Sequence, residues 1–223
     1  MAYKMKTLDY IIKKYKINIG RQHQVDVEGM KGSADLIKLF AELGFKLGVE
    51  VGVDRGLFSE YMMKTIPSVK MFGVDPWSNT CYEDYNPYKL PQTYFEGCYE
   101  EAVKRLTPFG DNYKIIRKFS MDALTDFEDN SLDFVYIDAN HDFTNFAMDL
   151  QYWFRKVRPG GIISGHDYVY YSYKKFNHVK RCLIAYARCY QMIPIFAVMG
   201  IRHGELKRDR YRSWFYVKQG GLQ

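Results

Sequence analysis

The 223-residue sequence contains no run of about 18 apolar residues, the length that a membrane-spanning helix requires. Its first residues, MAYKMKTLDYIIKKYK, carry charges throughout and lack the apolar stretch of a secretory leader. The cysteines have neither CxxC nor zinc-like spacing, and they are Cys81, Cys98, Cys182 and Cys189. We therefore expect a cytoplasmic protein with reduced thiols and no membrane partner.

Charge of one sign is not in large excess, since 32 Lys and Arg residues face 26 Asp and Glu residues. A nucleic-acid-binding module is usually more basic than this, so we do not expect a nucleic-acid partner. Basic residues gather near the N-terminus and at 202–212, which is compatible with an anionic small molecule or with a solvated surface. Aromatic residues are abundant at 17%, and they could serve a core, a stacking platform for bases or the wall of a cofactor pocket.

Short apolar runs alternate with amphipathic segments along the chain. Strands are expected at 46–53, 69–75, 113–118, 132–139, 161–168, 195–198 and 214–217. Helices between most of them predict a Rossmann-like, doubly wound α/β sheet. The sheet should be mostly parallel with an antiparallel edge strand, because a loop joins the last two strands. We expect an N-terminal helical extension at 1–44 and a main domain at 45–223, with a lid-like insertion at 76–95.

Ligands of such sheets bind at the carboxyl ends of the strands. The first strand of the main domain ends in EVGVDRG (50–56), where Gly52 and Gly56 permit a tight turn and a close approach of a ligand to the backbone. The full GxGxxG pattern is missing, because Asp54 occupies the middle glycine position. Asp75 ends the second strand, where an acid can accept both hydroxyls of a ribose. Because Asp54 would repel a pyrophosphate, a nucleoside cofactor without phosphates fits better than a nicotinamide dinucleotide.

Carboxylates and imidazoles follow the next pair of strands. Asp138, His141 and Asp142 come after the fourth strand, and His166 and Asp167 end the fifth. If these strands are neighbours, the side chains meet in one crevice. There they could coordinate a divalent cation or act as acid and base.

These motifs occur in one order: ExGxxxG at 50–56, GVDPW at 73–77, SMDAL at 120–124, IDANHD at 137–142 and RPGGIISGHDY at 158–168. Together they resemble the class I S-adenosylmethionine-dependent methyltransferases. The closer resemblance is to the small-molecule O-methyltransferase branch, which holds catechol-type and sugar- and antibiotic-modifying enzymes. It runs from Phe45 to Tyr168 and implies methyl transfer to a hydroxyl of a small molecule, such as a sugar, a glycan precursor or a natural product.

The resemblance also implies the cofactor, S-adenosylmethionine, and the side chains that bind it. The implied cofactor-binding residues are Glu50, Gly52, Gly56, Asp75, Trp77, Met121, Asp122 and Asp138. Glu50 and the two glycines would line the methionine end, Asp75 the ribose, and Met121 with Asp122 the adenine. Trp77 would form a wall beside the ribose, although a core position would equally suit it.

Metal-dependent relatives place oxygen ligands where Asp138 and Asp167 stand, which implies Mg or Mn at Asp138, His166 and Asp167. His166 departs from that pattern, because imidazole suits Mn, Fe or Zn better than Mg. Catechol-type enzymes carry their base three residues after the first metal-binding Asp, and His141 holds that position. We expect His141 to be the catalytic base, with Asp138 and His166 as further catalytic groups. Without a metal, either histidine could take the substrate proton.

The acceptor and the rival functions rest on weaker patterns. Aromatic and amide side chains at 76–95 and tyrosines at 168–173 suit a sugar-like or aromatic acceptor. The apolar helices at 8–15 and 34–43 could support a homo-oligomer. An NAD-dependent oxidoreductase is disfavoured by the incomplete glycine motif. An RNA-binding protein or RNA methyltransferase would draw on the basic clusters, but the strand at 132–139 ends without the NPPY or DPPY motif of base-amine methyltransferases, which favours an oxygen acceptor.

Overall fold

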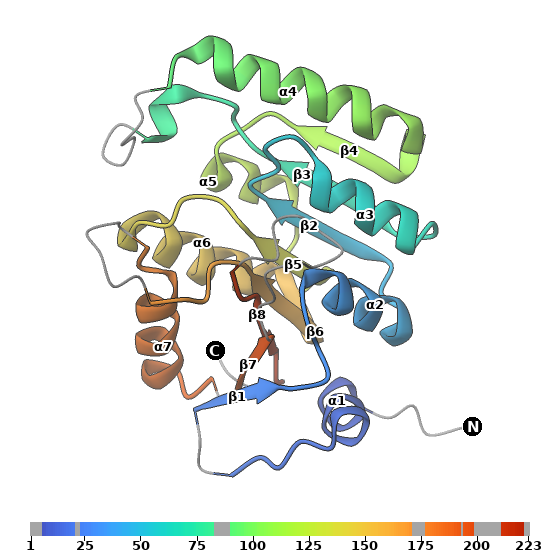
Figure 1. The fold of residues 1–223 in the computed structure, drawn as a ribbon, viewed down its shortest axis with the longest axis vertical. Coiled ribbons are helices and arrows are strands. Elements are labelled where there is room, and N and C mark those ends of the chain that lie inside the picture. Colours follow the sequence, from blue (N-terminus) through green and yellow to red (C-terminus); the bar gives the residue numbers. More distant parts are fainter. Residues whose placement is uncertain are drawn as a thin grey trace.

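The structure is a computed structural model that describes residues 6–20, 23–82, 90–170, 177–192, 194–198 and 211–220. Within these residues, one sheet contains all the strands (Figure 1). The strands are β1 (Gln24–Val27), β2 (Leu47–Val51), β3 (Lys70–Val74), β4 (Tyr113–Ile116), β5 (Leu132–Ile137), β6 (Val157–Gly165), β7 (Ile195–Val198) and β8 (Trp214–Val217).

Helices connect most of these strands, as the amphipathic segments predicted. They are α1 (Thr7–Tyr15), α2 (Ser33–Leu43), α3 (Leu57–Thr65), α4 (Gln92–Leu106), α5 (Ser120–Ala123), α6 (Phe143–Lys156) and α7 (Val179–Cys189), with 3-10 turns at Asn79–Tyr82, Thr107–Asn112 and Leu124–Asp126. Among the described residues, no helix is both long and apolar enough to cross a bilayer.

The order of strands in the sheet is β1-β7-β8-β6-β5-β2-β3-β4. Strand β8 pairs antiparallel with both β6 and β7, and all the other pairs are parallel. The Rossmann-like, mostly parallel α/β fold is therefore confirmed, and the extra N-terminal helices α1 and α2 are present. The prediction of an antiparallel edge strand is wrong in its position, because β7 and β1 lie beyond β8.

Strand β1 was not predicted, and it belongs to the segment expected to be helical. Its sequence, QVDV, is half polar, and only Val27 is fully buried. It pairs in parallel with β7, from Gln24 beside Ile195 to Val27 beside Val198. The N-terminal segment thus contributes the edge of the main sheet.

Helices pack on both faces of the sheet, and strand β5 shows how the alternation of side chains divides the core. Phe134 and Tyr136 point to the face covered by α2, α3 and α4, whereas Val135 and Ile137 point to the face covered by α5, α6 and α7. The ring of Phe134 stacks on Phe40 of α2 at 4.6 Å between centroids. Many of the aromatic residues are therefore core residues.

The order of the strands reverses beside β2. From β2 the chain proceeds outward through β3 to β4, and then returns to β5 and β6 on the other side. In open sheets of this kind, ligands bind outside the carboxyl ends of the strands at this reversal. The site should therefore lie where β2 and β5 end.

The predicted lid at 76–95 falls partly on residues 83–89, which lie outside the described residues together with Tyr171, Tyr173 and most of the basic loop at 202–212. Its last part is the first turn of α4, which begins at Gln92 rather than Glu96. There Tyr94 is exposed, while Phe95 is buried in the core.

Candidate functional site

The turn after β2 requires its first glycine. Gly52 has φ +92°, and a Cβ atom on it would lie 2.3 Å from the backbone oxygen of Asp138 at the end of β5. Asp54 and Gly56 also have positive φ angles, of 51° and 75°. The chain thus turns sharply from β2 into α3, and the ends of β2 and β5 meet backbone to backbone.

Two of the predicted cofactor-binding residues lie beneath this turn. Glu50 is buried and accepts a hydrogen bond from Ser59 of α3. Trp77 is 1% exposed, and its indole Nε1 donates to the backbone oxygen of Asp54 at 2.8 Å. Both side chains therefore support the turn from inside the protein.

Asp75, at the end of β3, links this strand to the turn that follows β2. Its Oδ2 accepts the backbone N–H groups of Val53 and Asp54 at 2.9 and 3.0 Å, and its Oδ1 accepts that of Trp77 at 2.8 Å. Burial raises the pKa of Asp75, and the three backbone donors oppose that rise. Asp75 is half-buried, so its carboxylate can also accept hydroxyl groups from a ligand.

The segment after β4 begins helix α5. Met121 is half-buried and Asp122 is exposed, so both reach the surface near the sheet end.

Ser120 was given no role from the sequence, yet it links helices α5 and α6. Its hydroxyl donates to Asp149 of α6 and accepts a hydrogen bond from Trp153 Nε1 at 2.7 Å. Burial raises the pKa of Asp149 to about 7.

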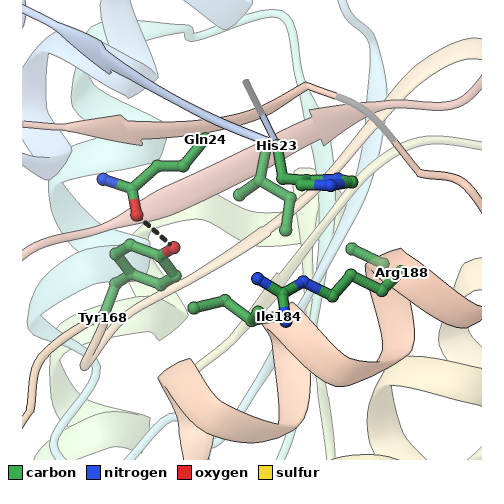
Figure 2. Close-up of a pocket in the computed structure, with 7 residues that line it drawn as sticks. His23, Gln24, Tyr168, Ile184 and Arg188 are labelled. Carbon is green, nitrogen blue, oxygen red and sulfur yellow. Dashed lines mark hydrogen bonds between the residues drawn. The ribbon is translucent and has the colours of Figure 1, made fainter. Parts of the chain in front are cut away.

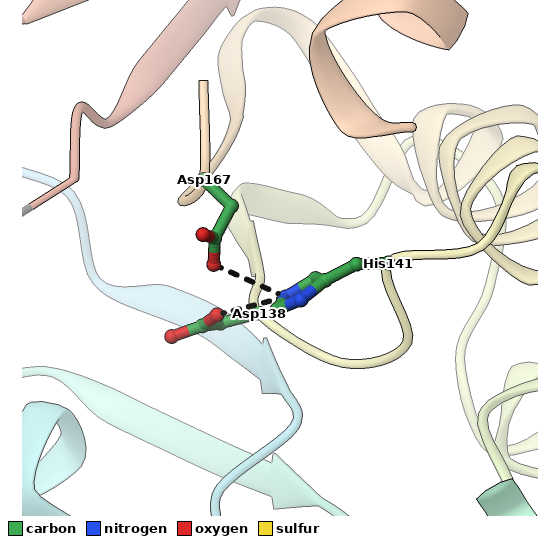
Figure 3. A group of neighbouring side chains, drawn as sticks. All are labelled: Asp138, His141 and Asp167. Atoms are coloured by element: carbon green, nitrogen blue, oxygen red, sulfur yellow. Dashed lines mark ion pairs between the residues drawn. The ribbon is translucent and has the colours of Figure 1, made fainter. Parts of the chain in front are cut away.

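The ends of β5 and β6 bring together the side chains predicted to be catalytic. His141 Nε2 lies 3.2 Å from Asp167 Oδ2 and 3.6 Å from Asp138 Oδ1 (Figure 3). His166 Nδ1 lies 3.2 and 3.9 Å from the same two oxygens. Two imidazoles therefore face one pair of carboxylates.

The carboxylates of this cluster raise the pKa of His141. Burial would lower the pKa of His141, but its hydrogen bond to Asp138 and the charge of Asp167 outweigh burial and raise the pKa above 6.5. The same geometry suits a cation, since ligand atoms of Asp138, His141 and Asp167 lie within 4.8 Å of one another. The cluster can thus hold either a proton or a metal ion.

Asn177 completes the cluster, although the sequence analysis did not single it out. It is 7% exposed, and its Nδ2 donates to Asp167 Oδ1 at 3.1 Å. An isolated asparagine outside any motif gives no signal in a single sequence. Only the fold places it beside Asp167.

A hollow lies between α7 and the β1–β7 edge (Figure 2). Its walls include Ile184 and Arg188 of α7 and His23 before β1. Tyr168, directly after Asp167, closes it by donating its hydroxyl to Gln24 Oε1 at 2.7 Å. Strand β1 thus braces the chain just beyond the site.

The chain is similar to known proteins over the part that carries these residues. A family model described as a methyltransferase domain matches residues 49–168. An uncharacterised protein of Sinorhizobium fredii is 23% identical over 122 residues, a stretch covering 55% of this chain but only 12% of that relative.

Similar solved structures share the fold at low sequence identity. An O-methyltransferase from Bacillus cereus in complex with SAH is 15% identical with a TM-score of 0.57, over 98% of this chain and 93% of that one. The O-methyltransferase TomG from Streptomyces achromogenes, in complex with SAM, is 14% identical with a TM-score of 0.56, over 97% and 91%. Spermidine synthase from Thermotoga maritima is 13% identical with a TM-score of 0.53, over 86% and 60%.

Proposed function

The chain belongs to the family of methyltransferase domains, and we propose that it moves a methyl group from S-adenosylmethionine to a hydroxyl of a small molecule. One observation carries the proposal. His141 and its two carboxylates stand at the ends of β5 and β6, and one of these carboxylates, Asp138, lies directly against the Gly52 turn, where a Cβ would meet its backbone. A proton acceptor therefore adjoins the backbone cradle that a cofactor would occupy.

The cradle supports a nucleoside cofactor. Gly52 and Gly56 allow the sharp turn through their positive φ angles, and Asp75 offers carboxylate oxygens at its edge. We assign the ribose hydroxyls to Asp75, the adenine to Met121 and Asp122, and the methionine end to the turn itself near Asp138. The buried side chains of Glu50 and Trp77 support the turn from inside the protein.

His141 is proposed as the base. In its neutral form, the ring carries its proton on Nε2, which faces the two carboxylates. The other ring nitrogen, Nδ1, would then take the proton from the acceptor hydroxyl as the oxygen attacks the methyl carbon. Asp138 and Asp167 orient the ring and stabilise the imidazolium that forms. S-adenosylmethionine, when bound, would supply the methyl group from its positively charged sulfur; the sulfur–methyl bond would break and S-adenosylhomocysteine would leave. The chain itself contributes alignment and exclusion of water.

The donor set also fits a divalent cation. The imidazole whose nitrogen groups with the oxygens of Asp138 and Asp167 is that of His141. We propose that His166, whose Nδ1 lies 3.9 and 3.2 Å from Asp138 Oδ1 and Asp167 Oδ2, would hold the ion with the two carboxylates, so that His141 serves the proton. A bound ion would lower the pKa of the acceptor hydroxyl. Two carboxylates and an imidazole favour Mn, Fe or Zn over Mg.

Side chains beside the site favour an anionic acceptor. Lys180, in the first turn of α7, lies over the rings of Tyr168 and Tyr170 at 4.7 and 4.3 Å. The neighbouring Arg181 is exposed, and Tyr170 is 60% exposed. Two cations and an open aromatic ring, about one helical turn from Asn177, suit a sugar or phenol that carries a carboxylate or phosphate.

Calorimetry with S-adenosylhomocysteine and with NAD tests the cofactor assignment. We expect binding of S-adenosylhomocysteine alone, and a large loss of affinity in Asp75→Ala. An equally conservative change at an exposed acid, Asp111→Ala, serves as the control and should bind normally. Binding of NAD but not of S-adenosylhomocysteine would contradict the proposal.

A further inference from the structure

Asn177 uses both ends of its buried side-chain amide. Nδ2 donates to Asp167 Oδ1 at 3.1 Å, and Oδ1 accepts the backbone N–H of Val179 at 3.1 Å. The amide therefore bridges the first turn of α7 and a carboxylate of the site. Because Asn177 is only 7% exposed, both hydrogen bonds are shielded from solvent.

This bridge determines which way the carboxylate of Asp167 faces. With Oδ1 held by Asn177, the second oxygen, Oδ2, lies 3.2 Å from His141 Nε2 and 3.2 Å from His166 Nδ1. Asp167 also has a backbone φ angle of +59°, which residues other than glycine rarely adopt. A backbone conformation of this kind persists only where several contacts hold it.

The same turn of α7 also holds the proposed base. The backbone N–H of His178 donates to the backbone oxygen of His141 at 2.8 Å. Adjacent residues of one segment thus fix Asp167 through a side chain and His141 through the backbone. The start of α7 acts as a clamp across the ends of β5 and β6.

We propose that Asn177 is a positioning residue for methyl transfer, an inference that rests on the proposed function of the site. Its amide aligns the Asp167 carboxylate so that Oδ2 orients the imidazole of His141 toward the acceptor. Asn177 touches neither the acceptor nor the cofactor in this role. Loss of the amide therefore lowers turnover and leaves cofactor binding intact.

The variant Asn177→Asp separates positioning from a structural role. A carboxylate at 177 still accepts the N–H of Val179, because Asp and Asn cap helices equally well. It cannot donate to Asp167, and it places a second negative charge against that residue. We expect kcat to fall about 10- to 100-fold, as for other groups that orient active-site ligands, with KM for S-adenosylmethionine unchanged.

The chain offers a matched control in Asn145→Asp. Asn145 Nδ2 donates to Asp142 Oδ2 at 2.6 Å at the exposed start of α6, so the control removes the same kind of bond by the same substitution. Its kcat should equal that of the unmodified protein. Full turnover in Asn177→Asp, or a fall of similar size in Asn145→Asp, would overturn the inference.

A crystal structure of Asn177→Asp gives a readout independent of activity. We expect the Asp167 carboxylate to turn away from His141, and an unchanged contact between them would overturn the inference even if no acceptor were found. Failure of the unmodified protein to transfer methyl groups would instead count against the proposed function. The two failures are thus distinguishable.

Discussion

The substitution Gly52→Ala tests whether the turn after β2 is the cofactor cradle. The new Cβ would lie 2.3 Å from the oxygen and 2.6 Å from the carbonyl carbon of Asp138, both backbone atoms that no rotamer change can move. Real Cβ contacts are essentially never below 3.0 Å, so β2 and β5 must separate by most of an ångström. That displacement moves Asp138 and opens the cradle.

The energetic cost has two parts, and Gly44→Ala isolates one of them. Gly44 ends helix α2 with φ +70° and has no atom within 4 Å of its would-be Cβ, so its substitution costs only backbone strain. Strain of this kind is about 1–2 kcal/mol. At about 2–4 °C per kcal/mol for a domain of this size, Gly44→Ala should lower Tm by a few degrees. Gly52→Ala adds overpacking of about 1–3 kcal/mol to a similar strain.

Thermal unfolding and calorimetry with S-adenosylhomocysteine measure both effects. We expect Gly44→Ala to bind the ligand normally. Gly52→Ala should be less stable than Gly44→Ala and should bind at least about 100-fold more weakly, because a misplacement of about 1 Å has effects of that size. Normal affinity in Gly52→Ala would refute the assignment of this turn to the cofactor.

Three further predictions follow from the charged groups. The pKa of His141 is raised above 6.5 and the base must be neutral, so turnover should rise with pH and reach half its maximum above pH 6.5. Asp167→Asn removes one cause of the raised pKa and should therefore lower the midpoint of the pH–rate profile. The pKa of Asp149 is raised from 3.8 to about 7, so folding stability is lost as the pH rises through this interval; Asp149→Asn should raise Tm at pH 8 and change it little at pH 4, and equal shifts at both would contradict the burial argument. Treatment with EDTA should lower turnover, Mn²⁺ should restore it better than Mg²⁺, and full activity in EDTA would exclude a required metal.

Patterns of apolar runs were sufficient to predict the parallel part of the sheet. Strand β5 is buried on both faces, so its sequence is a nearly unbroken apolar run. Strand β1 was missed because it has four residues, two of them polar, and pairs on one side only. The position of β8 inside the sheet depends on its long-range pairing with β6 and β7, which a local pattern does not contain.

The candidate site was predictable where its residues follow strands directly. The end of β5 and the end of β6 are neighbours in the sheet, so His141 and Asp167 could be placed together from order alone. The order of strands does not predict which side chains are buried. Trp77 stands in a motif that suggested a pocket wall, but its positive φ angle and its hydrogen bond to the backbone of Asp54 direct the side chain inward. Asn177 reaches the site from the start of another helix, which only the tertiary structure reveals.

The central claim is that the protein transfers a methyl group at the ends of β5 and β6, with His141 as the base. Radiolabelled methyl transfer from S-adenosylmethionine to a panel of carboxylated or phosphorylated sugars and phenols tests it most directly, with His141→Ala and the exposed-histidine control His23→Ala measured beside the unmodified protein. We predict turnover in the unmodified protein and the control, and a loss of about 10²- to 10⁴-fold in His141→Ala with unchanged affinity for S-adenosylhomocysteine. Full turnover in His141→Ala would contradict the account.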